Sequence, residues 1–297
     1  MENQGKQAAI QAASRLIRNL SQQMDHPIRL LELGCGEGQV IGELVKAHSQ
    51  LIDRTASLGV DYNPTSLARC RKDYPGLQVR EADLTDPVLL NTIGQFEIII
   101  LVNVLHEVFS SEYSPDLGEV EVSCGKQQVE MALRRAAACI APGGWLVLFD
   151  GLEPDGNPVS MIQIHLVDAH LRADFEIFAR QYQPFHISFK QMDDPLDLEL
   201  SLRDFTRYIT KSIFLGKPLW QTERMESYQY FTEQEFRSVF DRSGLTIHEL
   251  HTLTMNEERW QSNVEILSPN VDFPTEHILI LAQPGSAAPY SVSPHSL

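Results

Sequence analysis

Short apolar runs alternate with amphipathic stretches through the first half of the chain. The apolar runs predict strands at 28–33, 55–60, 77–80, 96–102 and 145–150. Stretches with apolar residues three or four positions apart predict helices at 6–24, 39–48, 64–74, 88–93 and 126–141. Strands that alternate with helices are typical of a parallel sheet with helices on both faces, so we expect an α/β fold.

This alternation stops after Asp150. Residues 151–231 are rich in His, Phe, Tyr and Met and show no clear strand pattern, so we expect a mainly helical segment. Beyond it, Thr232 and Glu235 have the spacing of a capping box, which predicts the start of a helix. The last expected elements are a helix at 233–242 and two strands at 245–253 and 277–282, joined by a polar loop.

The turn between the first strand and the next helix carries the clearest chemical pattern. It reads Glu32-Leu33-Gly34-Cys35-Gly36-Glu37-Gly38. Alternate glycines permit a tight turn and let a ligand lie against the backbone. The spacing is neither the GxGxxG of dinucleotide sites nor a P-loop. An acid before the first glycine favours a cationic ligand, although a turn that binds nothing remains an alternative.

Acidic residues follow the next two strands. Asp61 ends the second strand, where a carboxylate can accept hydrogen bonds from two ribose hydroxyls. Asp83 ends the third strand, where it could accept a bond from an adenine amine. Because parallel strands end at one edge of the sheet, these groups and the glycine turn are expected to meet there.

As an ordered set, these segments resemble the class I methyltransferases that use S-adenosylmethionine, in particular the type that acts on small molecules. The resemblance implies a doubly wound, mostly parallel seven-stranded sheet whose last strand is antiparallel. It assigns residues 1–150 and 232–283 to a Rossmann-like cofactor-binding domain and residues 151–231 to a helical lid that binds the acceptor. The Pro/Ser-rich residues 284–297 are expected to form a flexible tail.

The resemblance also implies the cofactor and its binding residues. The cofactor is S-adenosyl-L-methionine and the product S-adenosyl-L-homocysteine. The implied cofactor-binding residues are Glu32, Gly34, Cys35, Gly36, Gly38, Asp61, Tyr62, Ala82, Asp83, Leu84 and Asn103.

The segment Leu105-His106-Glu107 after the fourth strand is similar to the LHD/LHE stretch of small-molecule O-methyltransferases. In those enzymes the histidine is a general base, and imidazole titrates near neutral pH. Here Val108 stands where the family has an aromatic residue, so a packing or substrate-lining role for His106 is the alternative. The other histidines show no chelating spacing, and we expect no metal.

Composition narrows the choice of acceptor and location. The 297 residues include 24 Lys+Arg and 40 Asp+Glu, a net charge of −16 without a basic cluster, which makes a nucleic-acid partner unlikely. The absence of long apolar runs and of a signal-like start predicts a cytoplasmic protein without a membrane association. The scattered cysteines, Cys35, Cys70, Cys124 and Cys139, favour reduced thiols.

The sequence therefore predicts a methyltransferase for a small organic acceptor, with oxygen as a more favoured target than nitrogen or carbon. The chain is expected to act as a monomer or a homodimer. Two alternatives remain, which are a methyltransferase for RNA or protein and a non-catalytic scaffold that binds the cofactor.

Overall fold

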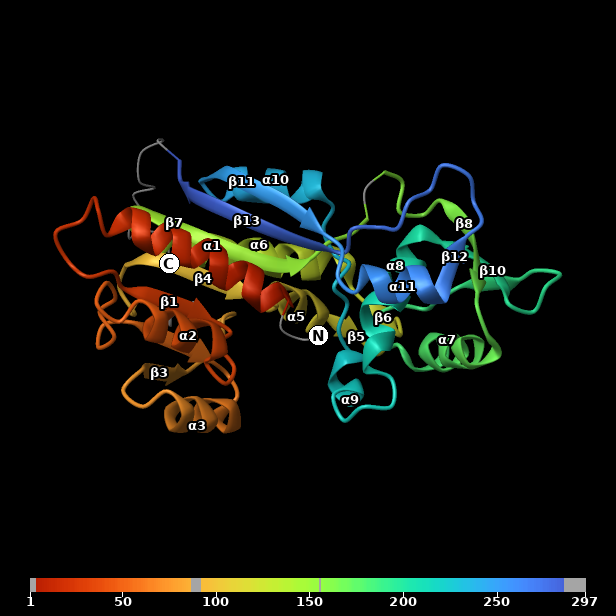
Figure 1. The fold of residues 1–297 in the computed structure, drawn as a ribbon, viewed down its shortest axis with the longest axis horizontal. Coiled ribbons are helices and arrows are strands. Elements are labelled where there is room, and N and C mark those ends of the chain that lie inside the picture. The colour runs from red at the N-terminus through yellow and green to blue at the C-terminus, as the bar shows by residue number, and fades with distance from the viewer. Residues whose placement is uncertain (1–3, 87–91, 155, 286–297) are drawn as a thin grey trace.

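The computed structural model describes residues 4–86, 92–154 and 156–285, and a seven-stranded sheet forms its larger part (Figure 1). Neighbouring strands of this sheet lie in the order β11 (Leu245–Leu253), β13 (His277–Pro284), β7 (Ile140–Gly151), β4 (Phe96–Val102), β1 (Leu30–Leu33), β2 (Leu58–Asp61) and β3 (Gln78–Glu81). Five strands from β7 to β3 are parallel, and β13 runs antiparallel to both β7 and β11. The expected sheet, including its antiparallel last strand, is confirmed.

Burial explains which strand is central. All seven residues of β4 are buried, because helices cover both faces of the sheet and strands flank both edges of β4. One face packs against α1 (Gln4–Leu20), α2 (Gln39–Ala47) and α3 (Pro64–Asp73). The other face packs against α5 (Leu105–Ser110), α6 (Val122–Ala138) and α10 (Glu233–Arg242). A small hairpin of β5 (Tyr113–Ser114) and β6 (Glu119–Val120) follows α5.

Capping residues fix the starts of two helices. The Asn63 side chain accepts hydrogen bonds from Thr65 N–H and Ser66 N–H, and Pro64 occupies the first turn of α3. The predicted capping box is present at α10, where Thr232 and Glu235 bond to each other's backbone N–H groups.

The start of β7 differs from the prediction. Helix α6 ends at Ala138 and β7 begins at Ile140, so the Pro142-Gly143-Gly144 segment lies inside the strand rather than before it. A Cβ on Gly144 would lie 2.7 Å from the Glu97 carbonyl oxygen. The glycine therefore allows the close approach of β7 to β4 that extends the strand.

The segment after β7 is not helical throughout, as Figure 1 shows on the side away from the large sheet. It contains β8 (Met161–Leu166), α7 (Ala169–Gln181), β9 (Phe189–Gln191), β10 (Asp197–Ser201), α8 (Leu202–Lys211), a 3-10 turn (Ser212–Phe214) and α9 (Trp220–Glu223). The polar loop expected between the last two strands contains α11 (Glu257–Asn263) and β12 (Val264–Ile266). Strand β12 pairs with β8, which gives a second, antiparallel sheet in the order β12-β8-β10-β9.

Sequence inspection overlooked this second sheet because its strands are short and only half apolar. In β8, Ile162, Ile164 and Leu166 are buried while the residues between them are more exposed. The same alternation in β10 buries Leu198 and Leu200. This period of two is the ordinary pattern of a strand with one solvated face, and it was present in the sequence.

The aromatic residues of this segment mainly form its own core. Tyr208 makes edge-to-face contacts with both Phe175 and Phe178, and Trp260 from α11 packs on Tyr208. All four are essentially buried. Phe178 and Tyr182 pack against each other within this core, with a ring-centroid distance of 5.0 Å, and both are buried.

Two expected segments lie outside the described residues. They are most of the helix predicted at 88–93 and the tail from residue 286 onward. Among the residues described, no helix combines the length and apolarity needed to cross a bilayer.

Candidate active site

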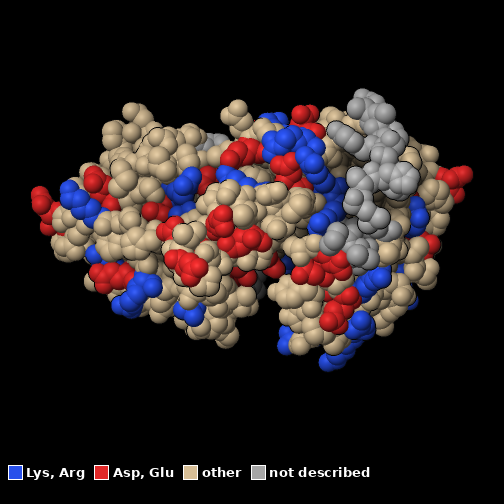
Figure 2. All heavy atoms as spheres, turned by 180° about the vertical axis from the view of Figure 1, so that it is seen from behind, with Lys and Arg blue, Asp and Glu red and all other residues tan. Residues whose placement is uncertain are grey.

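A cavity of about 680 Å³ lies where the parallel strands end and the segment after β7 begins. Its walls include Glu32 at β1, Asp61 at β2, Phe149 at β7 and Tyr228 beyond α9. Figure 2 shows the molecule hollowed between its two parts. The predicted residues that line the cavity are Glu32, Gly34, Cys35, Gly36, Asp61, Asn103 and His106. Those that do not are Gly38, Tyr62, Ala82, Asp83 and Leu84.

The glycine turn uses its three glycines for different reasons. All three have positive φ, with 76° at Gly34, 51° at Gly36 and 78° at Gly38. A Cβ on Gly34 would lie 2.4 Å from Val104 Cγ2, and one on Gly38 would lie 2.2 Å from Cys70 Sγ. A Cβ on Gly36 would meet nothing within 4 Å. Gly34 and Gly38 are therefore required by packing, whereas Gly36 leaves space for a ligand.

Glu32 brings a buried acid to this end of the cavity. Its Oε2 accepts a hydrogen bond from Ile41 N–H at 2.9 Å, in the first turn of α2. Burial raises the pKa of Glu32 to about 8, and the Ile41 hydrogen bond opposes this only partly. A cationic group in the cavity would favour the charged carboxylate, since opposite charges stabilise each other.

Asp61 ties the glycine turn to the end of β2. Its Oδ2 accepts from Gly36 N–H at 2.7 Å and its Oδ1 accepts from Asn63 N–H at 2.8 Å. Each carboxylate oxygen can accept more than one bond, so the side chain can hold the turn and still meet a ligand. Sequence patterns did not indicate this structural role.

The residues expected to border the adenine lie away from the cavity wall. The Tyr62 side chain is 64% exposed. Asp83 Oδ1 accepts from the backbone N–H and the hydroxyl of Thr85, both at 2.7 Å, which closes a turn. Leu84 is buried in the core.

His106 and Asp150 form a buried pair at the other end of the cavity. The His106 ring is 2% exposed and the Asp150 side chain is fully buried. His106 Nδ1 donates to Asp150 Oδ1 at 2.8 Å, because a carboxylate can only accept. Asp150 Oδ2 also accepts from Val104 N–H at 3.0 Å and Leu105 N–H at 2.8 Å. The imidazole is therefore held in one orientation, with Nε2 on the opposite side.

The pKa of each member of this pair is shifted from its ordinary value. Burial alone would lower the pKa of His106, but the Asp150 carboxylate outweighs it and raises the pKa to about 9. Burial alone would raise the pKa of Asp150, but the imidazolium and the backbone hydrogen bonds outweigh it and lower the pKa. These opposite shifts favour an imidazolium–carboxylate pair in the cofactor-free protein.

Charged residues that sequence analysis missed surround His106. Its Nε2 lies 3.5 Å from Glu226 Oε2. The fully buried Lys211 ammonium lies 2.6 Å from Glu223 Oε2 and 3.6 Å from Glu226 Oε2. Burial raises the pKa of Glu107 to about 7. A lysine within an aromatic, apolar stretch was the signal that could have indicated such a buried charge.

Three of these side chains could together ligate a metal ion. Candidate ligand atoms of His106, Glu107 and Glu226 all lie within 4.8 Å of one another. Lys211 already supplies a positive charge beside the same Glu226 oxygen that faces His106. Because that carboxylate is balanced by the lysine, we assign no metal here.

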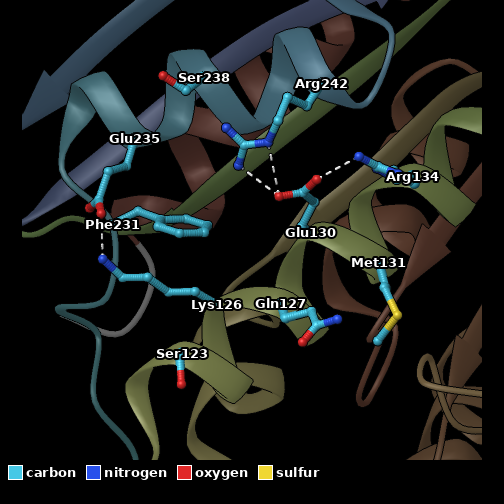
Figure 3. A pocket seen from close by; sticks show the side chains of 10 residues that line it. All are labelled: Ser123, Lys126, Gln127, Glu130, Met131, Arg134, Phe231, Glu235, Ser238 and Arg242. Atoms are coloured by element: carbon cyan, nitrogen blue, oxygen red, sulfur yellow. Dashed lines mark hydrogen bonds and ion pairs between the residues drawn. The ribbon is translucent and has the colours of Figure 1, made fainter.

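A second hollow, of about 780 Å³, lies between α6 and α10 on the face turned to the viewer in Figure 2. Its charged side chains pair with one another, as Figure 3 shows. Lys126 bonds to Glu235 at 2.5 Å, and Glu130 is shared by Arg134 and Arg242, both at 2.6 Å. Each charge is thus already satisfied, and the chemistry belongs to the first cavity.

The first cavity fits S-adenosylmethionine at its glycine-turn end. Gly36 leaves open space there, and the buried Asn103 Oδ1 has no hydrogen-bond partner. A doubly wound sheet with an antiparallel last strand, a GxGxG turn and an acid ending β2 together define a class I S-adenosylmethionine-dependent methyltransferase. A family model described as a methyltransferase domain matches residues 6–250, so the chain belongs to that family and its cofactor is S-adenosylmethionine.

Solved structures with a similar course of the chain share little sequence with it. An S-adenosylmethionine-dependent methyltransferase from Clostridium acetobutylicum is 12% identical, with a TM-score of 0.47, over 92% of this chain and 90% of that one. A putative methyltransferase from Bacillus halodurans is 13% identical, with a TM-score of 0.47, over 91% of this chain and 99% of that one. The CcbJ methyltransferase from Streptomyces caelestis is 12% identical, with a TM-score of 0.47, over 95% of this chain and 90% of that one. No curated protein sequence matches the chain. Similarity at this level says nothing about the acceptor.

Proposed function

We propose that this methyltransferase transfers the methyl group to an oxygen atom of a small organic acceptor in the cytoplasm, with His106 as the general base. The observation that carries the proposal is the buried His106–Asp150 pair beside the cavity. Asp150 accepts from Nδ1, so a substrate hydroxyl would have to reach Nε2 in place of Glu226, whose Oε2 lies 3.5 Å from that nitrogen. A general base must lie within hydrogen-bond distance of the proton that it removes. The Asp150 hydrogen bond fixes the orientation of the imidazole and so keeps Nε2 in position for this.

Proton transfer to His106 requires a neutral ring. With a pKa of about 9, the ring of the empty cavity is protonated at neutral pH. When bound, S-adenosylmethionine supplies an electrophilic methyl group on a positively charged sulfur. His106 loses its proton more readily beside a positive charge, because like charges disfavour the imidazolium. Nε2 can then accept the acceptor's hydroxyl proton while Asp150 stabilises the charge that forms.

The cavity walls suit a small, partly apolar acceptor. Ile213, Phe214 and Leu219, from the segment after β7, line the cavity. Tyr228 packs edge-on against His106, with a ring-centroid distance of 4.0 Å. Glu107, Glu223 and Glu226 line the same region. The net charge of −16 without a basic cluster argues against an RNA acceptor. Glu32 and the open space at Gly36 would hold the amino-acid end of the cofactor and so align the methyl group for in-line attack.

The test is His106→Gln, assayed by release of S-adenosylhomocysteine with a panel of small phenols, alcohols and amines. Loss of the base should lower kcat by roughly 10²–10⁴-fold, while cofactor affinity stays nearly unchanged. The wild-type rate should fall as the pH drops through the pKa of His106, and the variant should lose this dependence.

His165→Gln is a matched control. His165 Nδ1 bonds to Asp197 Oδ1 at 2.7 Å, the same kind of pair, but on β8 and outside the cavity. Its loss should leave kcat unchanged. A loss of only a few-fold in His106→Gln, with the pH dependence intact, would contradict base catalysis and leave His106 a lining residue.

A further inference from the structure

Glu276 and His277 stand at the beginning of β13 with unused hydrogen-bonding capacity. Glu276 is 2% exposed and His277 is 7% exposed. Glu276 Oε1 accepts from Met255 N–H at 2.5 Å, but Oε2 has no partner. His277 Nδ1 has no partner either. Both residues line the cavity.

The fold explains why these side chains reach the cavity. Strand β13 runs antiparallel to β7, and His277 pairs with Gly151 at the carboxyl end of β7. The start of β13 therefore lies at the same edge of the sheet as the ends of the parallel strands. Buried polar atoms of native proteins nearly always have a partner, so an unpartnered carboxylate oxygen at a cavity indicates a missing donor.

The surroundings favour a positively charged donor. Among residues 4–86, 92–154 and 156–285, no lysine or arginine pairs with Glu276, and the nearest basic atom recorded is His277 Nδ1 at 3.7 Å. The His277 ring stacks on Phe149 with a centroid distance of 5.3 Å and meets the edge of Tyr228 at 5.6 Å. The Tyr228 ring also carries the Lys211 ammonium, 3.7 Å from its centroid. The acceptors that a ligand ammonium would meet are therefore Glu276 Oε2 and His277 Nδ1, and the rings hold His277 in place.

The cofactor's own ammonium group is too far away to be this donor. Its proposed site is beside Glu32 at β1, and β4 and β7 lie between β1 and β13. Three strand spacings amount to about 14 Å. The start of β13 therefore faces the acceptor end of the cavity rather than the amino-acid end of the cofactor.

We propose that Glu276 and His277 form a subsite that binds an ammonium group of the acceptor. This inference rests on the proposed function, since it concerns the acceptor of the same cavity. Glu276 Oε2 accepts one N–H of the ammonium. His277, with its proton on Nε2, accepts another through Nδ1. The enzyme thus acts on amine-bearing hydroxyl compounds and discriminates against their neutral analogues.

The experiment measures binding without turnover, by calorimetry on protein saturated with S-adenosylhomocysteine. Two probe pairs differ only by amine and hydroxyl groups: tyramine with 4-(2-hydroxyethyl)phenol, and 1,4-diaminobutane with 1,4-butanediol. In at least one pair, the wild-type protein should bind the amine about tenfold more tightly, as expected for a hydrogen bond to a charged group.

Glu276→Gln should abolish this preference while leaving the affinity for S-adenosylhomocysteine unchanged. The glutamine keeps an oxygen for Met255 N–H, so the fold is retained. Glu265→Gln is the matched control, because it removes the same charge from an exposed position on β12. His277→Phe, a second variant that keeps the stacked ring, should weaken the preference without removing it.

Equal binding of amine and neutral probe in both pairs would overturn the subsite and mean that water satisfies Glu276. A preference that survives in Glu276→Gln would overturn it by locating the amine elsewhere. Weaker binding of S-adenosylhomocysteine in Glu276→Gln would assign Glu276 to the cofactor. If wild-type protein failed to bind S-adenosylhomocysteine, the proposed function would fail with it.

Discussion

The two ends of the cavity differ in the hydrogen-bond partners of their charged side chains. At the glycine-turn end, acids bond to backbone N–H groups, as Glu32 does to Ile41 and Asp61 does to Gly36. At the His106 end, side chains bond to one another, as in the pairs with Asp150 and Glu226. The first end spans one short stretch of chain, whereas the second gathers residues that are far apart in sequence.

This difference separates a rigid site from a tunable one. Backbone donors are fixed by the strands and helices that carry them, so the glycine-turn end is preorganised for one ligand. At the His106 end, the groups that titrate also face one another, and the pKa values of His106 and Glu107 are raised to about 9 and about 7. Glu32 at the glycine-turn end has a raised pKa as well, but its hydrogen-bond partner is a backbone N–H whose charge does not change with pH. One end suits an invariant cofactor, and the other suits proton transfer and acceptor choice.

The largest expected effect is the loss of the cofactor in Gly36→Val. A branched side chain at φ 51° would point into the space reserved for the ligand, and the backbone conformation would be strained. We expect no saturable binding of S-adenosylhomocysteine by calorimetry. Gly143→Val is the control, since Gly143 has φ 75° and open space but lies outside the cavity. Normal binding by a folded Gly36→Val protein would refute a ligand-cradling turn.

At the other end, Asp150→Asn should affect catalysis rather than cofactor binding. The amide leaves His106 without the charge that raises its pKa, so the pH at which the rate rises should shift downward from about 9. The rate plateau should fall by up to roughly the 10²–10⁴-fold of general base catalysis, because the ring loses its fixed orientation. A pH–rate profile measures both. An unshifted profile would show that another group controls the reaction.

Asp61→Ala should have an intermediate effect. Removal of a charged hydrogen-bond acceptor costs about 1.5–3 kcal/mol, which is about tenfold or more in cofactor affinity. Tyr62→Ala, at the exposed neighbouring position, should change affinity far less. Calorimetric titration with S-adenosylhomocysteine distinguishes them, and near-equal affinities for wild type and Asp61→Ala would remove Asp61 from the site.

The smallest expected effect is a pH dependence of stability that both ends share. The folded protein keeps protons on Glu32 up to a pKa of about 8 and on His106 up to about 9, above the ordinary values of 4.5 and 6.5. The folded state thus binds more protons than the unfolded state in between, so stability falls as the pH rises from 4.5 to 9.

Thermal unfolding of the cofactor-free protein should therefore give a lower Tm at pH 9 than at pH 6. Each kcal/mol lost lowers Tm by about 2–4 °C in a protein of this size class. Glu32→Gln should flatten the lower part of this dependence, and Asp150→Asn the upper part. A Tm that rises over this interval would contradict the raised pKa values.

Local patterns were sufficient for the large sheet and for the glycine-turn end. The apolar run at β4, the capping box at Thr232 and the glycines before α2 each act within a few residues of chain. The second sheet was missed although Ile162, Ile164 and Leu166 alternate clearly, because its strands are short and only half apolar and because β12 joins it from a distant loop. Asp83 was correctly expected at a strand end, but its side chain turns toward Thr85 instead of the cavity.

Local sequence patterns were enough to predict the doubly wound sheet, the family and the cofactor, because strand–turn–helix motifs depend on consecutive residues. The surroundings of His106, by contrast, became visible only in the folded chain. His106 was visible in the sequence, but its partner Asp150 lies 44 residues away and Glu226 belongs to the segment after β7. Burial then set their charges, since desolvation and pairing act only once the chain has folded. The acceptor end of the cavity is therefore a property of the fold as a whole.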